Sequence, residues 1–134
     1  MRALIIGSSV ATRQIGESLI EKVDELVFLD FDSYKFHSWG LFKGDNASFQ
    51  SGDLEKMNTL LDAGLEESDI LIVDAGDDVL SLFVAQKCKI SLSTAIFIVL
   101  DDMSVADIYE SSGFIILDSH NLGLDKIIKY LEKF

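Results

Sequence analysis

Two features near the start of the chain have the chemistry of a nucleotide site. Gly7 follows the apolar run 3–6 and precedes Ser8 and Ser9, after which the sequence becomes amphipathic. In a strand–turn–helix unit of this kind, backbone N–H groups at the start of the helix point at the position of a phosphate. Asp30 ends a second apolar run about 20 residues further on, the spacing at which a carboxylate accepts hydrogen bonds from the ribose hydroxyls of an adenosine. Because that carboxylate would repel a 2′-phosphate, the pattern disfavours NADP.

The loop after the first strand departs from the dinucleotide-binding fingerprint. That fingerprint has glycines at its first, third and sixth positions, which here are Gly7, Ser9 and Thr12. The serine takes up space through which a backbone approaches a pyrophosphate, and Thr12 is expected to loosen the packing of helix against strand. Hydroxyls of Ser8 and Ser9 and the charge of Arg13 offer other phosphate contacts, although the serines are equally suited to cap the helix. Three alternatives stay open: an intact dinucleotide, a smaller adenosine ligand, or an empty cleft.

Further turns offer candidate contacts, each with an ordinary structural alternative. Asp53 follows a weak third strand, where its carboxylate either faces an adenine edge or caps the next helix. Ala75 and Gly76 follow the fourth strand and are small enough for close approach of a nucleotide, although an ordinary turn uses the same residues. Asp30 itself can instead cap the next helix or be solvated. The predicted cofactor-binding residues are Gly7, Ser8, Ser9, Arg13, Asp30, Phe31, Gly52, Asp53, Leu54, Ala75, Gly76 and Asp77.

These turns share one edge only if the strands are parallel, and the order of elements predicts that they are. Apolar runs alternate with amphipathic segments along the chain, which predicts an α/β fold: a Rossmann-like, doubly wound parallel six-stranded sheet, order 3-2-1-4-5-6, with helices on both faces. Residues 1–134 are predicted to form a single domain. Strands are expected at 3–6, 26–30, 48–51, 69–73, 95–100 and 114–117, and helices at 10–23, 33–42 (ended by Gly44), 54–63, 78–89, 104–111 and 122–134.

Composition argues against several classes of protein. The net charge of −12, from 23 acidic and 11 basic residues, disfavours a nucleic-acid groove, which needs a basic surface. No apolar run approaches the ~20 residues that span a bilayer and no secretory leader precedes the first strand, so we expect a cytoplasmic protein without direct membrane insertion. The single cysteine, Cys88, rules out an internal disulfide. Neither His37 nor His120 has metal-ligand spacing, so no metal site is predicted.

No catalytic constellation accompanies the predicted fold. Asp118, Ser119 and His120 have the composition of a hydrolase triad, but consecutive side chains do not converge as triad members must, so we interpret them as a loop. Cys88 lies in a predicted helix and is interpreted as a small buried hydrophobe rather than a nucleophile. The nucleotide unit uses the whole chain, which leaves no second domain to hold the substrate of an NAD-dependent reductase. We therefore predict that the protein is not an enzyme.

Four segments carry a resemblance to a known family. They are RALIIG at 2–7, VFLDFD at 27–32, SGD at 51–53 and DAGLEESDILIVDAGDD at 62–78. The chain resembles the TrkA-N domain, also called KTN, the N-terminal lobe of RCK (regulator of potassium conductance) proteins. The last segment is the most specific, because it combines the glycine that ends a helix, an acidic turn, a buried strand, a small-residue turn and an acid pair.

The resemblance implies a regulatory module that binds NAD, NADH, ATP, ADP or AMP. Such a module transmits occupancy to a potassium channel or transporter, usually by pairing with another such domain, which favours a homodimer. By position, the resemblance implies a phosphate loop at Gly7, Ser8 and Ser9, a ribose ligand at Asp30, an adenine-side contact at Asp53, and a lining at Ala75, Gly76 and Asp77.

The sequence departs from the family in three respects. Ser9 and Thr12 replace glycines, and Val99 stands where many members have an arginine that meets the phosphates. The usual C-terminal effector lobe is missing, so the chain is either a stand-alone subunit or a sensor module of a larger protein. These departures motivate a second hypothesis, a protein-interaction scaffold with a decayed nucleotide site. Its candidate surfaces are the helix around Phe83 and an apolar stripe on the last helix, which can equally pack on its own sheet.

Overall fold

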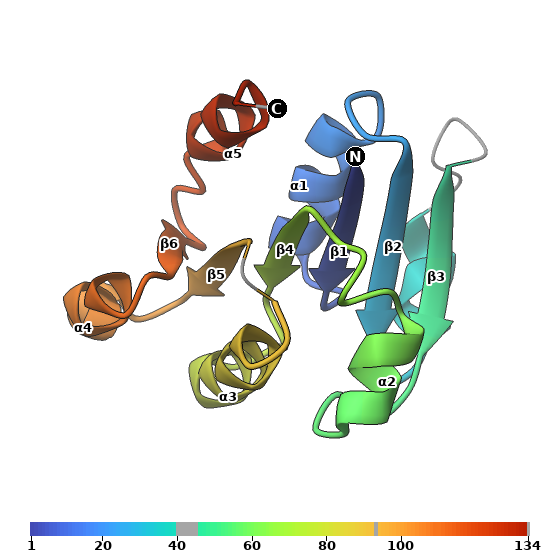
Figure 1. Cartoon of the computed structure of the whole chain (residues 1–134), viewed down its shortest axis with the longest axis horizontal. Coiled ribbons are helices and arrows are strands. Elements are labelled where there is room, and N and C mark those ends of the chain that lie inside the picture. Colours follow the sequence, from blue (N-terminus) through green and yellow to red (C-terminus); the bar gives the residue numbers. More distant parts are fainter. Residues whose placement is uncertain (40–45, 93, 134) are drawn as a thin grey trace.

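The computed structural model describes residues 1–39, 46–92 and 94–133, which form one six-stranded sheet. All neighbouring strands are parallel, in the order β3-β2-β1-β4-β5-β6 (Figure 1). The predicted doubly wound fold and strand order are confirmed. The strands are β1 (Arg2–Ile6), β2 (Glu25–Asp30), β3 (Ala47–Ser51), β4 (Ile70–Val73), β5 (Ala95–Leu100) and β6 (Ile115–Asp118). The helices are α1 (Val10–Leu19), η1 (Tyr34–Trp39, 3-10), α2 (Met57–Asp62), α3 (Asp78–Lys89), η2 (Met103–Val105, 3-10), α4 (Ala106–Ser111) and α5 (Leu124–Leu131).

An apolar core lies on each face of the sheet. On one face α1, η1 and α5 contribute Ile15, Phe36 and Ile127, and on the other α2 and α3 contribute Leu60 and Val84. Figure 1 shows α5 on the opposite side of the sheet from α3 and α4. Because the strands bury side chains on both faces, they appear in the sequence as continuous apolar runs rather than alternating ones.

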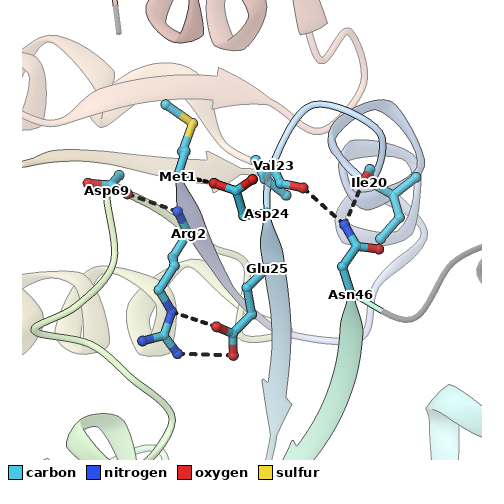
Figure 2. A network of polar contacts seen from close by, with 8 residues as sticks. All are labelled: Met1, Arg2, Ile20, Val23, Asp24, Glu25, Asn46 and Asp69. Atoms are coloured by element: carbon cyan, nitrogen blue, oxygen red, sulfur yellow. Dashed lines mark hydrogen bonds and ion pairs between the residues drawn. The ribbon is translucent and has the colours of Figure 1, made fainter.

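Helix α1 is shorter than its periodicity predicts. It ends at Leu19 with Ile20 as its C-cap, whereas the apolar spacing continues to Val23. The side-chain amide of Asn46 donates hydrogen bonds to the carbonyls of Ile20 and Val23, at 2.9 and 3.0 Å (Figure 2). Because these carbonyls bind a residue next to β3, the chain turns toward β2 instead of continuing the helix.

Helix α2 begins at Met57, later than the predicted start at Leu54. The Asp53 side chain accepts a hydrogen bond from the backbone N–H of Glu55 at 3.0 Å, and its carbonyl accepts one from Lys56 at 3.0 Å. These bonds form a turn that places Leu54 fully in the core before the helix starts.

The second predicted α-helix is a 3-10 helix, η1. The Ser33 carbonyl accepts a hydrogen bond from the N–H of Phe36 at 3.1 Å, which is the three-residue spacing of that helix. The same spacing places Phe36 and Trp39 on one side, and both are buried in the core beside β2. The predicted helix end at Phe42 and stop at Gly44 lie outside the described residues.

Polar contacts fasten the amino-terminal edge of the sheet, opposite the predicted site. Arg2 in β1 contacts the Glu25 carboxylate in β2 through two nitrogens, at 2.9 and 3.0 Å (Figure 2). Its backbone N–H donates to the Asp69 carboxylate just before β4 at 2.8 Å. These contacts hold β1 in register between β2 and β4. Within the described ranges, no helix has the length and apolar character needed to cross a membrane.

Candidate nucleotide-binding site

The turn after β1 requires the glycine that the sequence provides. Gly7 has a φ of 121°, and a Cβ at this position would lie 1.8 Å from the carbonyl oxygen of Asp74. Its backbone N–H donates to the carbonyl of Leu29 at 2.7 Å. The close approach of this turn to the one after β4 leaves no room for a side chain, so Gly7 sets the shape of the crevice.

Ser9 acts as the N-cap of α1. Its hydroxyl accepts a hydrogen bond from the N–H of Thr12 at 3.1 Å and donates one to the Asp74 carboxylate at 2.7 Å. Thr12 is fully buried, and its hydroxyl donates to the Ser9 carbonyl at 2.8 Å. The buried Thr12 side chain therefore packs beneath the turn and completes the cap.

Asp30 lies at the carboxyl end of β2 beside the first turn. Its carboxylate accepts hydrogen bonds from the Ser8 hydroxyl and from the N–H of Phe31, the latter at 2.7 Å. These contacts hold the carboxylate on the wall of a cavity of about 260 Å³. The described residues that line this cavity are Ser8, Ser9, Asp30, Phe31, Asp32, Lys35, Asp74, Ala75 and Gly76.

A second cavity of about 310 Å³ lies on the other side of Ser9 and Asp74. Ser9, Asp74 and Gly76 line both cavities, and the second also has Asp101 on its wall. The first cavity is lined by residues at the ends of β1, β2 and β4, and the second by the start of α1 and by residues at the ends of β4, β5 and β6; the strand order reverses between β1 and β4. Ligands of doubly wound sheets bind at such a switch point in strand order. The hydrogen bond from Ser9 to Asp74 therefore stands between two halves of one crevice.

The crevice is predominantly acidic. Burial of Asp74 raises the pKa of its carboxyl, and the nearby charges of Asp101 and Asp78 raise it further, while hydrogen bonds from Ser9 and Gly76 oppose the shift. Lys35 is the one basic residue among the described residues that line the two cavities. The site thus has carboxylates suited to hydroxyl and amine groups and little positive charge for a phosphate.

The start of α3 links the turns after β4 and β5. Asp77 caps the helix, since its side chain accepts a hydrogen bond from the N–H of Leu80 at 2.8 Å. The Asp78 carboxylate accepts from the N–H groups of Asp101 and Asp102, at 2.8 and 2.9 Å. The acid pair therefore shapes the rim of the crevice, and Asp77 does not line either cavity.

The remaining predicted residues lie away from the two cavities. Arg13 pairs with Glu17 along the exposed surface of α1 at 3.1 Å. Gly52 donates from its backbone to the Asp30 carbonyl at 3.0 Å, while Asp53 forms the turn before α2 and Leu54 is in the core. The structure brings together Ser8, Ser9, Asp30, Phe31, Ala75 and Gly76, with Gly7 forming the turn beneath them.

In the first cavity, the sequence interpretation missed three lining residues: Asp32, Lys35 and Asp74. Asp74 directly follows a buried apolar strand, just as Asp30 ends one, so an acid at the end of an apolar run is a sequence signal that could have identified Asp74. Asp32 accepts a hydrogen bond from the N–H of Tyr34 at 3.0 Å, at the start of η1. The position of Lys35 depends on η1, whose packing on aromatic side chains of β2 and β3 has no local sequence signal.

The polar residues after β6 do not form a catalytic triad. The Ser119 hydroxyl lies 2.9 Å from Nδ1 of His120, and an Asp118 oxygen lies 3.5 Å from the same nitrogen. A triad needs the nucleophile and the orienting carboxylate on opposite nitrogens of the histidine ring, whereas here both lie at Nδ1, so this arrangement cannot relay a proton. Cys88 is fully buried, and burial raises the pKa of its thiol to about 12, which keeps it protonated.

Comparison with known proteins gives one family and several structures of similar fold. The TrkA-N domain family matches residues 3–119. No curated protein sequence matches the chain significantly.

Three of these structures illustrate the similarity of fold. The GsuK channel bound to NAD is 14% identical, with a TM-score of 0.70 over 86% of this chain and 21% of its own. The Shewanella denitrificans Kef CTD in AMP-bound form is 18% identical, with a TM-score of 0.64; the match covers 84% of this chain and 66% of the Kef chain. The GsuK RCK domain is 19% identical, with a TM-score of 0.71; the match covers 98% of this chain and 28% of the GsuK chain. This chain thus spans between 21% and 66% of the length of these structures.

Proposed function

Because the chain belongs to the TrkA-N domain family, we propose that it is a non-catalytic regulatory domain that binds an adenine nucleotide in the crevice around Asp30. The candidates are NAD(H), ATP, ADP and AMP. One observation carries the proposal: the Asp30 carboxylate, held by Ser8 and the N–H of Phe31, lines a cavity beside the turn at Gly7. That is where the carboxylate of a doubly wound sheet accepts hydrogen bonds from ribose hydroxyls.

The neighbouring residues suit the rest of an adenosine. Phe31 is 44% exposed on the cavity wall and offers an apolar surface for the base. Ala75 and Gly76 line the opposite wall, and a Cβ added to Gly76 meets no atom within 4 Å, so the ligand can approach the backbone there. The descriptions of two similar structures, a channel bound to NAD and a Kef CTD in AMP-bound form, agree with this class of ligand.

The proposed output of binding is control of a potassium channel or transporter, through a homodimer or through contact with the transport protein. This part of the proposal rests on family membership and on the descriptions of the GsuK and Kef structures. Nucleotide occupancy would change the contacts of the crevice rim, where Asp78 ties α3 to the loop after β5.

A thermal melt with each nucleotide tests the proposal. AMP, ADP, ATP, NAD and NADH are each added at millimolar concentration, with inorganic phosphate and ribose as controls. A ligand present at 100 times its Kd should stabilise the fold by about 2.7 kcal/mol, which is easily measured as a higher Tm. If none of the five shifts the Tm or releases heat in calorimetry, the nucleotide-binding function is wrong.

A protein-interaction scaffold is the second candidate function, and one observation favours it. Val79 and Phe83 on α3 and Ile90 at its C-cap are 80%, 45% and 80% exposed. The stripe on α5, the other predicted surface, packs on the sheet through Ile127 instead. A chain that sediments as a monomer and carries a co-purified nucleotide would count against the scaffold.

A further inference from the structure

The start of α1 already holds an acidic group of the chain itself. A phosphate in a Rossmann-like site lies at this helix start, where unpaired N–H groups and the helix dipole attract an anion. Here the Ser9 hydroxyl accepts from the N–H of Thr12 and donates to Oδ2 of Asp74 at 2.7 Å. The other oxygen of Asp74 accepts from the N–H of Gly76 at 3.4 Å. The Asp74 carboxylate is therefore anchored to the helix cap from one side and to the turn after β4 from the other.

The surroundings of Asp74 add negative charge rather than offset it. Asp30 and Asp32 face the first cavity together with Lys35, and Asp101 faces the second. Asp78 at the start of α3 also acts on Asp74, since its charge and that of Asp101 raise the Asp74 pKa. A ligand phosphate at this position would meet several carboxylates and one lysine among the described residues of the cavity walls.

We propose that Asp74 is a specificity-determining residue of the crevice, which excludes polyphosphate groups from the start of α1 and selects adenosine ligands with few phosphates. This inference rests on the proposed function, because it concerns which adenosine ligand the same crevice accepts. The ribose and base contacts at Asp30 and Phe31 are shared by all candidates, so discrimination arises where the candidates differ, at the phosphates. The order of affinity is AMP over ADP over ATP.

Calorimetric titration of Asp74→Asn tests the inference. Asparagine keeps the size of the side chain and can still accept the hydrogen bond from Ser9, but removes the charge. We expect ADP and ATP to bind at least about tenfold more tightly to the variant than to the wild type, because a like charge within a few ångströms is removed. Adenosine, which has no phosphate, should bind both within about twofold.

Asp107→Asn on α4 is the matched control, since it changes the net charge by the same amount at an exposed residue that lines neither cavity. An unchanged ratio of ATP to adenosine affinity in Asp74→Asn, or the same change in Asp107→Asn, would overturn this inference alone. Failure of adenosine and of every nucleotide to bind either protein would instead overturn the proposed function.

A pH titration of the wild type gives a second test that does not depend on the variant folding. The phosphates of NAD do not titrate between pH 5 and 8, so protein groups control any pH dependence of its binding. Protonation of Asp74 removes its charge, and NAD affinity is therefore expected to rise as pH falls, while adenosine affinity stays flat over the same range. An NAD affinity that falls relative to the adenosine affinity as the pH is lowered would overturn the inference.

Discussion

Asp30 and Asp74 face the same crevice from the ends of β2 and β4, on either side of β1, and have different roles. Asp30 is held by Ser8 and by a backbone N–H, with its carboxylate on the wall of a cavity. The Asp74 carboxylate lies between the cap of α1 and the turn at Gly76. The sequence identified the first because a buried run ends in an acid at the right spacing. It contained the same signal for the second, but the role of Asp74 depends on Ser9, which only the folded turn brings within reach.

At the residue scale, Asp74→Asn should stabilise the fold at neutral pH. Burial and the charges of Asp101 and Asp78 raise the Asp74 pKa in the folded state, so the folded protein binds this proton more tightly than the unfolded chain. The contribution of Asp74 to stability is therefore full below its unfolded pKa and is lost as pH rises through its folded pKa. The variant should have a higher Tm than the wild type near pH 7, and the difference should vanish toward pH 3–4.

Asp102→Asn provides a comparison of opposite sign. The Ser104 N–H lowers the Asp102 pKa, so replacing this carboxylate should lower the Tm near pH 7. Thermal melts of the three proteins across pH measure both effects. A Tm of Asp74→Asn below that of the wild type at pH 7 would contradict the assigned environment of Asp74.

At the scale of elements, the sequence predicted the strands better than the helices. Strands of this sheet are apolar on both faces, so each is a continuous run that local composition reveals. Helix ends depend on distant partners instead: Asn46 ends α1 from beyond η1, and burial of Phe36 and Trp39 favours a 3-10 helix at η1. The predicted site residues were also only partly placed correctly, since half of them line the crevice. Arg13 and Asp77 instead bind partners within their own helices, Glu17 and the N–H of Leu80.

The turn between β1 and α1 predicts a strong effect of Gly7→Ala. Both Gly7 and Gly76 have positive φ, so an alanine at either position is strained by about 1–3 kcal/mol. At Gly7 the new Cβ also collides with the Asp74 carbonyl, which should cost about 1–3 kcal/mol more, whereas at Gly76 it meets no atom. Urea denaturation of the two variants isolates the collision as their difference. Equal destabilisation would show that the turns are not packed as described.

At the scale of the whole molecule, charge is the dominant feature. The net charge is −12, and the carboxyl edge of the sheet gathers Asp30, Asp74, Asp101 and Asp118 after four parallel strands. Parallel topology places these turns side by side, so acids that are far apart in sequence repel one another in the fold. A crevice with this field suits a ligand recognised through hydroxyls and a base, and disfavours one recognised through several phosphates.

This field predicts that salt stabilises the protein. Raising NaCl from about 20 mM to about 0.5 M shortens the screening length from about 20 Å to below 5 Å and weakens the repulsion. We expect the Tm to rise by a few degrees, measured by scanning calorimetry. A Tm that falls over the same range would show that favourable ion pairs outweigh the repulsion among the acids.

The most direct test of the central claim is calorimetric titration of AMP into the wild type and Asp30→Asn, with Asp107→Asn as the charge-matched control. If Asp30 binds the ribose, loss of hydrogen bonds to a charged acceptor should weaken AMP binding about 10- to 100-fold in Asp30→Asn and leave the control unchanged. Binding of AMP to Asp30→Asn with wild-type affinity would contradict the account.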